Sequence, residues 1–201
     1  MKNSTITTIK KVALAASLCL GVAANAHAGL VGVKTIEIKN HIYLATQYLQ
    51  VAEVAAVNTA GTNVALASNG GTASAPDFWS STSSASKAID GSTAGSYPNI
   101  FHEGQNNTHD TLTITLASVQ ELLSFQIWGR TDCCSNRDLF DVTFKDGLGN
   151  ILFIAEDLDA RGQSHTASVR LPNTVPEPAS LALLGAGLLG IAGLRRRSSK
   201  R

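Results

Sequence analysis

Apolar and polar residues alternate with a period of two along much of the middle of the chain, a pattern that predicts half-buried β-strands. The residues around Leu123, Phe125 and Ile127 indicate a further strand, and Ile151–Ala155 reads as a short buried run. Between two of these segments, Asp146–Asn150 has the glycines and Asp typical of a hairpin turn. The alternating segments are Lys34–Ile38, Thr111–Leu116, Phe140–Lys145 and Thr166–Leu171.

Helical periodicity is weak in the same region. Residues 68–86 are rich in Ser, Thr, Gly and Ala and predict a long loop, whereas Tyr48–Val57 suits either a helix or a strand. We therefore expect an all-β fold of about eight strands, arranged as a β-sandwich or jelly roll.

The first 28 residues have the features of a secretory signal peptide. Lys10 and Lys11 precede an apolar run at residues 12–24, and Ala26-His27-Ala28 fits the small-residue rule for signal peptidase, so we place the cleavage after Ala28. The run is too short to span a bilayer of about 30 Å. Cys19 lies within it, but Ala16 stands where a lipoprotein signal requires Leu.

The other end of the chain, residues 175–201, also has the features of a sorting element. Pro176, Glu177 and Pro178 precede an apolar stretch, residues 179–194, which is followed by a basic cluster of Arg195, Arg196 and Arg197. A plain C-terminal membrane anchor would account for the apolar helix and the basic flank. The order of these parts resembles the PEP-CTERM sorting signal of exopolysaccharide-producing Gram-negative bacteria. The resemblance implies transient association with the inner membrane, recognition by an exosortase and release to the cell surface or matrix.

The two ends conceal the charge of the part between them. The whole chain has a formal charge of +1, but residues 29–174 contain eight Lys and Arg against fourteen Asp and Glu, a formal charge of −6. This single-domain-sized segment is large enough for a hydrophobic core. Its acidity makes nucleic acid an improbable partner.

The residues with the most distinctive chemistry lie in one segment, 128–137. Removal of the signal leaves two adjacent cysteines, Cys133 and Cys134. In an oxidising compartment they form a vicinal disulfide, two free buried thiols or an intermolecular bridge. Arg130 and Arg137 flank the pair, and forked guanidinium donors suit vicinal hydroxyls. Asp132 either orients one guanidinium toward a sugar or forms a structural ion pair with Arg130.

Several motifs resemble the discoidin, or coagulation factor 5/8 type C, domains of the galactose-binding-like superfamily, and most closely the F-type (fucolectin) lectins. They are Asn63–Ala67, Ser86–Gly91, Phe101-His102 and the Arg-x-Asp-Cys-Cys-x-x-Arg pattern of residues 130–137. The resemblance implies an eight-stranded jelly roll in which His102, Arg130 and Arg137 hydrogen-bond a sugar, fucose- or galactose-like. Cys133 and Cys134 would form a vicinal disulfide that packs on the ring. His109 is the rival histidine.

The family's closing strand and calcium site have counterparts in an unusual order. Tyr48–Val54 resembles the closing strand but precedes the opening one, which implies a circular permutation. In the lectins a structural calcium lies between this strand and the Asp-Gly turn. The resemblance assigns that role here to Glu53, Asp90, Ser92 and Asn99. Otherwise, Asp90 simply caps its turn and Glu53 is solvated.

Together these features predict an exported, non-enzymatic carbohydrate-binding module whose ligand is a fucose- or galactose-like terminus or the producer's own exopolysaccharide. The alternative is a structural or adhesive matrix protein with the same sandwich and no sugar binding. No motif for a nucleophile or a phosphate loop occurs in the sequence, so an enzyme is disfavoured. We interpret the acidic run Glu156–Asp159 as a solvated loop.

Overall fold

The computed structural model describes residues 29–44, 47–105 and 109–172, and in this part of the chain the fold is all-β, as predicted. Short 3-10 helices interrupt the connections, namely η1 (Ile42–Leu44), η2 (Ala67–Asn69), η3 (Ser81–Ser83), η4 (Ala85–Ile89) and η5 (Ser135–Arg137). The strands are β1 (Leu30–Asn40), β2 (Gln50–Val51), β3 (Glu53–Asn58), β4 (Thr72–Ser74), β5 (Phe101–His102), β6 (Leu112–Trp128), β7 (Leu139–Lys145), β8 (Ile151–Asp159) and β9 (Thr166–Arg170).

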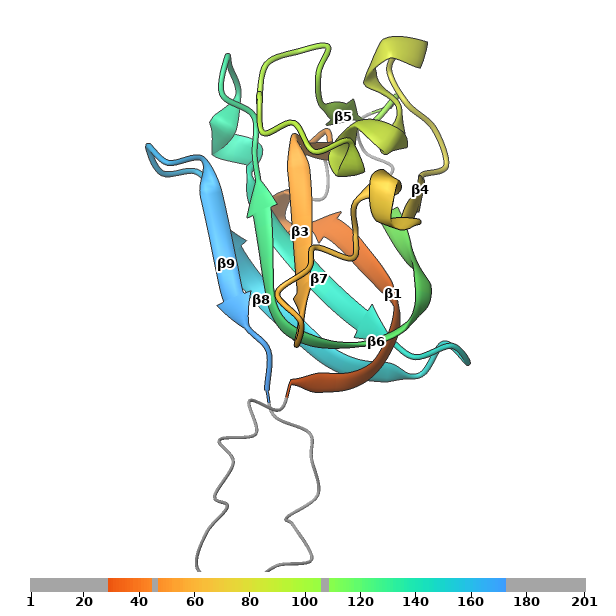
Figure 1. Cartoon of the computed structure of the whole chain (residues 1–201). Helices are drawn as coiled ribbons and strands as arrows, with labels where there is room; N and C mark the ends of the chain where they lie inside the picture. Colours follow the sequence, from red (N-terminus) through yellow and green to blue (C-terminus); the bar gives the residue numbers. More distant parts are fainter. Residues whose placement is uncertain (1–28, 45–46, 106–108, 173–201) are drawn as a thin grey trace, which may run out of the picture.

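Strand β6 organises the whole sheet. It is 17 residues long and pairs antiparallel with four strands. Its first half, near Ile114, lies between β1 and β4, and its second half, near Phe125, lies between β3 and β9. Beyond β1 the sheet continues through β7 to β8, and β2 pairs separately with β5. Because β6 curves between its two halves, one sheet supplies both layers of the fold (Figure 1).

The core lies between these layers and is built from the alternating positions that the pattern predicts. Ile114, Phe125 and Phe144 are fully buried, and the rings of Phe125 and Phe144 meet edge to face with centroids 5.5 Å apart. Each fully buried large apolar side chain contributes about 1.5–3 kcal/mol through its removal from water. The core thus fixes which face of each strand points inward, and with it the register.

Several details differ from the predicted pattern. The two strands expected around Thr111–Leu116 and Leu123–Ile127 are the two halves of the single strand β6. Residues 156–159 belong to β8 and are not a loop. Residues 151–155 are not a buried run either, since Ile151 and Ile154 are exposed. The reason is that β8 ends the sheet, with no strand hydrogen-bonded to its outer side among the described residues.

Two ambiguous segments are resolved. Residues 48–57 form strands β2 and β3 and not a helix. The long loop at residues 68–86 is confirmed for most of its length, although β4 and short helical turns lie within it. The described residues contain nine strands, of which β2, β4 and β5 are only two or three residues long, against the eight expected.

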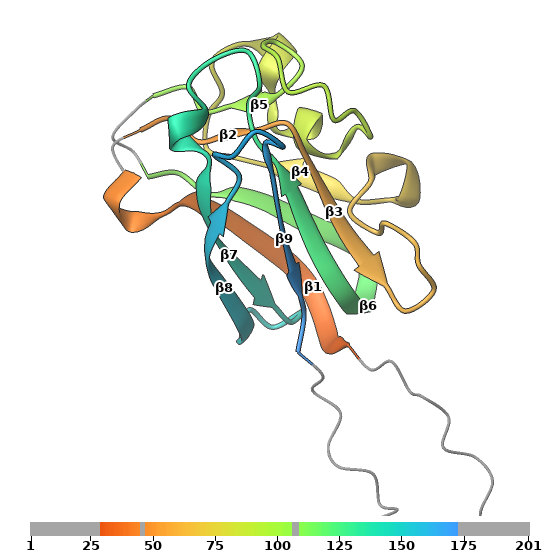
Figure 2. The same cartoon turned by 90° about the vertical axis from the view of Figure 1, so that its left-hand side faces the viewer.

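The two ends of the described chain lie side by side. Leu30 pairs with Leu122, and the N–H of Leu171 donates to the carbonyl oxygen of Leu123, one residue farther along β6. Figure 2 shows both ends leaving the same end of the domain. Both predicted sorting segments lie outside the described residues, so their structures stay predictions. They are the signal peptide at one end, and the Pro-Glu-Pro motif, apolar helix and Arg cluster at the other. Among the described residues, no helix has the length and hydropathy needed to cross a membrane.

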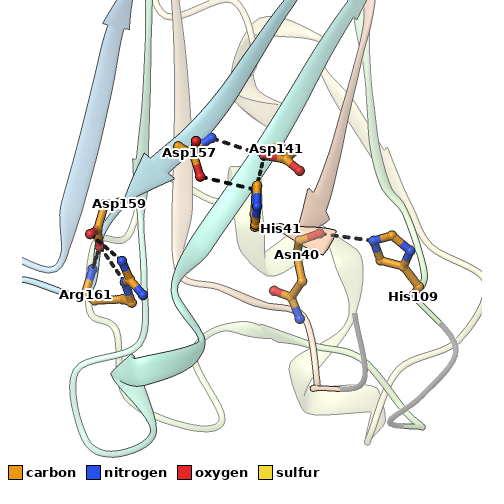
Figure 3. Close-up of polar contacts among 7 residues, drawn as sticks. All are labelled: Asn40, His41, His109, Asp141, Asp157, Asp159 and Arg161. Carbon is orange, nitrogen blue, oxygen red and sulfur yellow. Dashed lines mark hydrogen bonds and ion pairs between the residues drawn. The ribbon is translucent and has the colours of Figure 1, made fainter. Parts of the chain in front are cut away.

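At the far end of β1, a histidine joins three strands. The Nδ1 atom of His41 lies 2.9 Å from a carboxylate oxygen of Asp141 on β7 and 3.3 Å from one of Asp157 on β8 (Figure 3). Asp157 has a left-handed backbone (φ 58°), and its N–H donates to Asp141 at a bulge in the β7–β8 register. The hydrogen bond with Asp141 raises the pKa of His41, and the charges of Asp141, Asp157 and Glu156 add to the effect.

We predict that His41 stabilises the fold in acid more than in base. The pKa of His41 in the folded protein is raised above its ordinary value of 6.5. The contribution of His41 to the free energy of unfolding is therefore fully present below pH 6.5 and is lost as pH rises through the folded pKa. Thermal melts of His41→Gln and the unchanged protein should therefore differ more at pH 5.5 than at pH 8.5. An equal Tm difference at both pH values would contradict this assignment.

Candidate functional site

The predicted sugar-binding residues meet at the end of the domain opposite its two termini. Three loops converge there, the ones that contain Trp79, Tyr97 and the segment 129–138 (Figure 1). The N–H of Trp79 donates to the carbonyl oxygen of His102, and the N–H of Thr131 donates to that of Gly95. Backbone hydrogen bonds thus fix the Trp79 loop to β5 and the Tyr97 loop to the segment 129–138.

Aromatic rings surround His102. Its ring centroid lies 5.1 Å from that of Tyr48, 5.5 Å from that of Trp79 and 6.1 Å from that of Tyr97. Trp79 is 56% exposed and Tyr97 is 38% exposed, whereas His102 is buried. We call Tyr48, Trp79, Tyr97 and His102 the aromatic cluster. It presents apolar ring surface to solvent above a buried imidazole.

Both motif arginines border the aromatic cluster. The guanidinium carbon of Arg130 lies 5.8 Å from the ring centroid of Tyr97, and that of Arg137 lies 5.6 Å from the ring centroid of Tyr48. These are cation–π distances. The Nε atom of Arg137 is buried and has no hydrogen-bond partner among the described residues.

Asp132 is bound to Arg130. Arg130 donates from Nε and Nη2 to the two carboxylate oxygens of Asp132, over 2.6 and 3.2 Å, and the N–H of Tyr97 also donates to this carboxylate. These hydrogen bonds, that of Arg130 first, lower the pKa of Asp132. Asp132 therefore fixes the direction of the Arg130 side chain.

The protonation of His102 follows from its surroundings. Its Nδ1 lies 2.7 Å from the carbonyl oxygen of Glu103, so Nδ1 carries the proton and donates, which makes Nε2 an acceptor. Burial lowers the pKa of His102, and the charges of Arg130 and Arg137 lower it further, against the opposing hydrogen bond to Glu103. His102 is thus a neutral acceptor beside two cationic donors.

Asp138 supports the motif loop from beneath. It is fully buried, and one of its carboxyl oxygens, Oδ2, accepts the N–H of Arg130 over 2.8 Å. A side chain at position 129 would collide with this carboxyl, because a Cβ atom added to Gly129 would lie 2.2 Å from Oδ2. Burial raises the pKa of Asp138 to about 8. Gly129 and Asp138 together set how the chain leaves β6 and enters the loop.

The two cysteines form the vicinal disulfide, with Cys133 exposed and Cys134 half-buried. Cys134 has a left-handed backbone (φ 60°) and directly precedes η5, the 3-10 turn that ends at Arg137. The disulfide therefore lies in the chain between the two arginines, at the surface.

The predicted calcium ligands converge only in part. The N–H of Gly91 donates to Oε2 of Glu53, so Glu53 does reach the Asp90 turn. The other oxygen, Oε1, is buried and has no hydrogen-bond partner among the described residues, and burial raises the pKa of Glu53 to about 8. Glu53 is therefore not solvated, unlike in the alternative interpretation.

The rest of that turn is occupied by its own hydrogen bonds. Asp90 accepts the N–H of Ser92 and the ammonium of Lys87, over 2.9 and 3.2 Å. Asn99 donates its N–H to Ser96. Among the described residues, no three His, Cys, Asp or Glu side chains are grouped to hold a metal. If calcium were bound here, Glu53 and Asp90 would supply two oxygens, and the further ones would have to come from carbonyl groups or water.

Sequence reasoning missed three members of the aromatic cluster, Tyr48, Trp79 and Tyr97. An available signal was Phe78-Trp79 within a Ser- and Thr-rich loop, where large aromatic residues have no core to enter. The Nε2 atom of the rival histidine, His109, lies 3.1 Å from the carbonyl oxygen of Asn40 (Figure 3).

We predict that Asp138 makes the domain less stable as pH rises. The folded protein retains a proton that the unfolded chain releases above about pH 3.8, so stability declines between that pH and about 8. In Asp138→Asn this decline should be smaller, and Glu53 would account for part of what remains. Thermal melts from pH 5 to pH 8 test this, and identical slopes for both proteins would show that Asp138 is ionised throughout.

Comparison with known proteins identifies only the C-terminal segment. Residues 174–197 match the PEP-CTERM protein-sorting motif. No curated protein and no solved structure matches the chain. The matched motif indicates exosortase-dependent export and sorting to the cell surface or extracellular matrix, in a Gram-negative context.

Proposed function

We propose that residues 29–174 form a carbohydrate-binding module of the discoidin/F-type lectin kind that acts after exosortase-dependent sorting. The observation that carries the proposal is the aromatic cluster bordered by Arg130 and Arg137. Sugars present hydroxyl groups on their edges and C–H groups on their faces. Binding them requires fixed donors beside exposed apolar surface, and both occur here.

In this proposal each part of the site has a separate task. The exposed face of Trp79 and the disulfide supply apolar contact for a pyranose ring. Arg137 and the remaining Nη donor groups of Arg130 bind vicinal hydroxyls, and His102 Nε2 accepts a hydroxyl proton. The ligand class is a fucose- or galactose-like terminus or the producer's own exopolysaccharide. A single shallow site binds modestly, so avidity would come from multivalency.

Binding is proposed here, and not catalysis, because neither acid beside the arginines suits general acid–base chemistry. Asp138 is fully buried beneath the loop, and Asp132 holds Arg130 with both oxygens. Its lowered pKa makes Asp132 a poor proton donor.

One observation favours the second candidate, a structural or adhesive matrix protein that binds no sugar. Arg130 is only 12% exposed in its side chain, and Asp132 already uses two of its donors. If the Arg130–Asp132 ion pair only stabilises the loop, this end of the domain would be rigid but would bind no sugar. The measurement on Arg137 below distinguishes the two.

We further propose that the sandwich is a circularly permuted jelly roll with one structural Ca²⁺. The contact of Glu53 with Gly91 supports the permutation, as do the neighbouring ends of the chain at Leu30 and Leu171. The unpartnered Glu53 Oε1 and the nearby Asp90 would hold the ion, which favours 6–8 oxygen ligands.

Replacement of Arg137 should abolish glycan binding without unfolding the domain. A hydrogen bond to a charged donor contributes about 1.5–3 kcal/mol, which corresponds to a roughly 10- to 100-fold weaker affinity. We expect this loss for Arg137→Ala on a glycan array. Arg170→Ala, an exposed arginine on β9 near the opposite end, is the matched control and should bind normally. An unchanged protein that binds no glycan on the array would reject the lectin proposal.

Calcium should raise the Tm, because a ligand that binds only the folded state stabilises it. The rise should disappear with a chelator and in Glu53→Gln, but should persist in the exposed control Glu156→Gln. The measurement is a thermal melt with and without Ca²⁺. If Ca²⁺ leaves the Tm of the native protein unchanged, the proposed structural calcium site is rejected.

A further inference from the structure

The end of the domain opposite the aromatic cluster carries exposed aliphatic side chains. Val31 is the second residue of β1, Val119 lies within β6, Leu148 lies in the β7–β8 turn and Ile151 begins β8. Their exposed fractions are 48%, 58%, 89% and 59%. We call these four residues the basal set. Large exposed apolar side chains gathered at one end of a domain mark a candidate interaction surface.

Backbone pairing brings the segments of the basal set together. Val31 pairs with Glu121, two residues from Val119. Gly32 lies against the side chain of Leu152, which is next to Ile151 and links the start of β1 to the β8 end of the hairpin. Both views place these segments at the end where the chain enters and leaves (Figures 1 and 2).

Charged side chains near the basal set are occupied by the protein itself. The ammonium of Lys34 donates to the carbonyl oxygens of Leu116 and Ala117. The carboxylate of Glu121 accepts the N–H of Gly29, and that of Asp146 accepts those of the hairpin turn. These charged groups are thus bonded within the domain, and the basal set supplies exposed apolar surface beside them.

The length of the chain beyond the domain determines what this end faces. Leu171 is still hydrogen-bonded to β6, the matched sorting motif begins at residue 174 and its apolar stretch begins at residue 179. Eight residues at 3.3–3.6 Å each reach at most about 29 Å. A domain of this size has a radius of gyration of about 15 Å, hence a diameter near 40 Å. While the apolar stretch is in a membrane, Leu171 stays within about 29 Å of it, so the domain cannot invert to point this end directly away from the bilayer.

We propose that the basal set rests in the lipid interface while the sorting tail is attached, so that the domain stands on the membrane with its aromatic cluster outward. The short tether supplies a high effective concentration, so four small aliphatic contacts suffice to hold one orientation. Cleavage of the tail would remove the tether, and the contacts alone would release the domain.

The test uses the full chain in liposomes with brominated lipids, which quench tryptophan fluorescence only on close contact. Leu148→Trp adds a fluorophore to the basal set, and Phe78→Trp adds one at the opposite end, where the native side chain is 48% exposed. After subtraction of the unsubstituted chain, we expect the added fluorescence to be strongly quenched for Leu148→Trp and unquenched for Phe78→Trp.

Two results would overturn the proposal. Equal, weak quenching of both variants would show that the domain stands off the bilayer. A blue-shifted Leu148→Trp emission that brominated lipid does not quench would show that the tail or a second copy of the chain covers this end.

Discussion

Strand β6 is the constraint on which the rest of the structure depends. Each layer of the fold needs it, since its first half pairs with β1 and β4 and its second half with β3 and β9. Its alternating side chains enter one core from both layers, with Ile114 and Phe125 fully buried. It ends at Trp128, one residue before Gly129, so the core determines where the motif loop begins. The position of the candidate site is thereby set by hydrophobic packing far from it.

The site itself is built at some cost in stability. Asp138 and Glu53 are both buried acids whose pKa values are raised to about 8, each beneath or beside a loop that carries the predicted binding residues. A buried acid stabilises little by itself but dictates the direction of the backbone N–H that it accepts. Arg130 and Gly91 are the donors concerned. This arrangement is typical of a site in which rigidity is favoured over stability.

The sequence predicts the strands well where one face is buried. In residues 112–116 and 140–145 the alternation of burial follows the alternation of hydropathy. It fails at β8, where Ile151 is apolar but exposed, because hydropathy does not distinguish the core from an outer surface at the edge of a sheet. It also cannot show that two strands join, because residues 117–121 break the alternation between Leu116 and Leu122.

The candidate site was predictable in its charged members and not in its aromatic ones. Arg130 and Arg137 stand in one short motif, and the resemblance to the F-type lectins adds His102 to them. Tyr48, Trp79 and Tyr97 come from three segments that only the folded chain brings together. Asp138 follows the motif directly, yet its role depends on burial beneath Gly129, which no local pattern encodes.

The central claim is that sugar binds at the aromatic cluster. NMR titration of the ¹⁵N-labelled protein with L-fucose and with D-galactose tests it most directly, because the two tryptophans give two assignable indole N–H signals. The account predicts that one sugar shifts the indole signal of Trp79 and the backbone signals of residues 130–137, while those of residues 117–121 and 146–150 stay in place. Saturating sugar that shifts none of these signals, or only those of the basal segments, would contradict it.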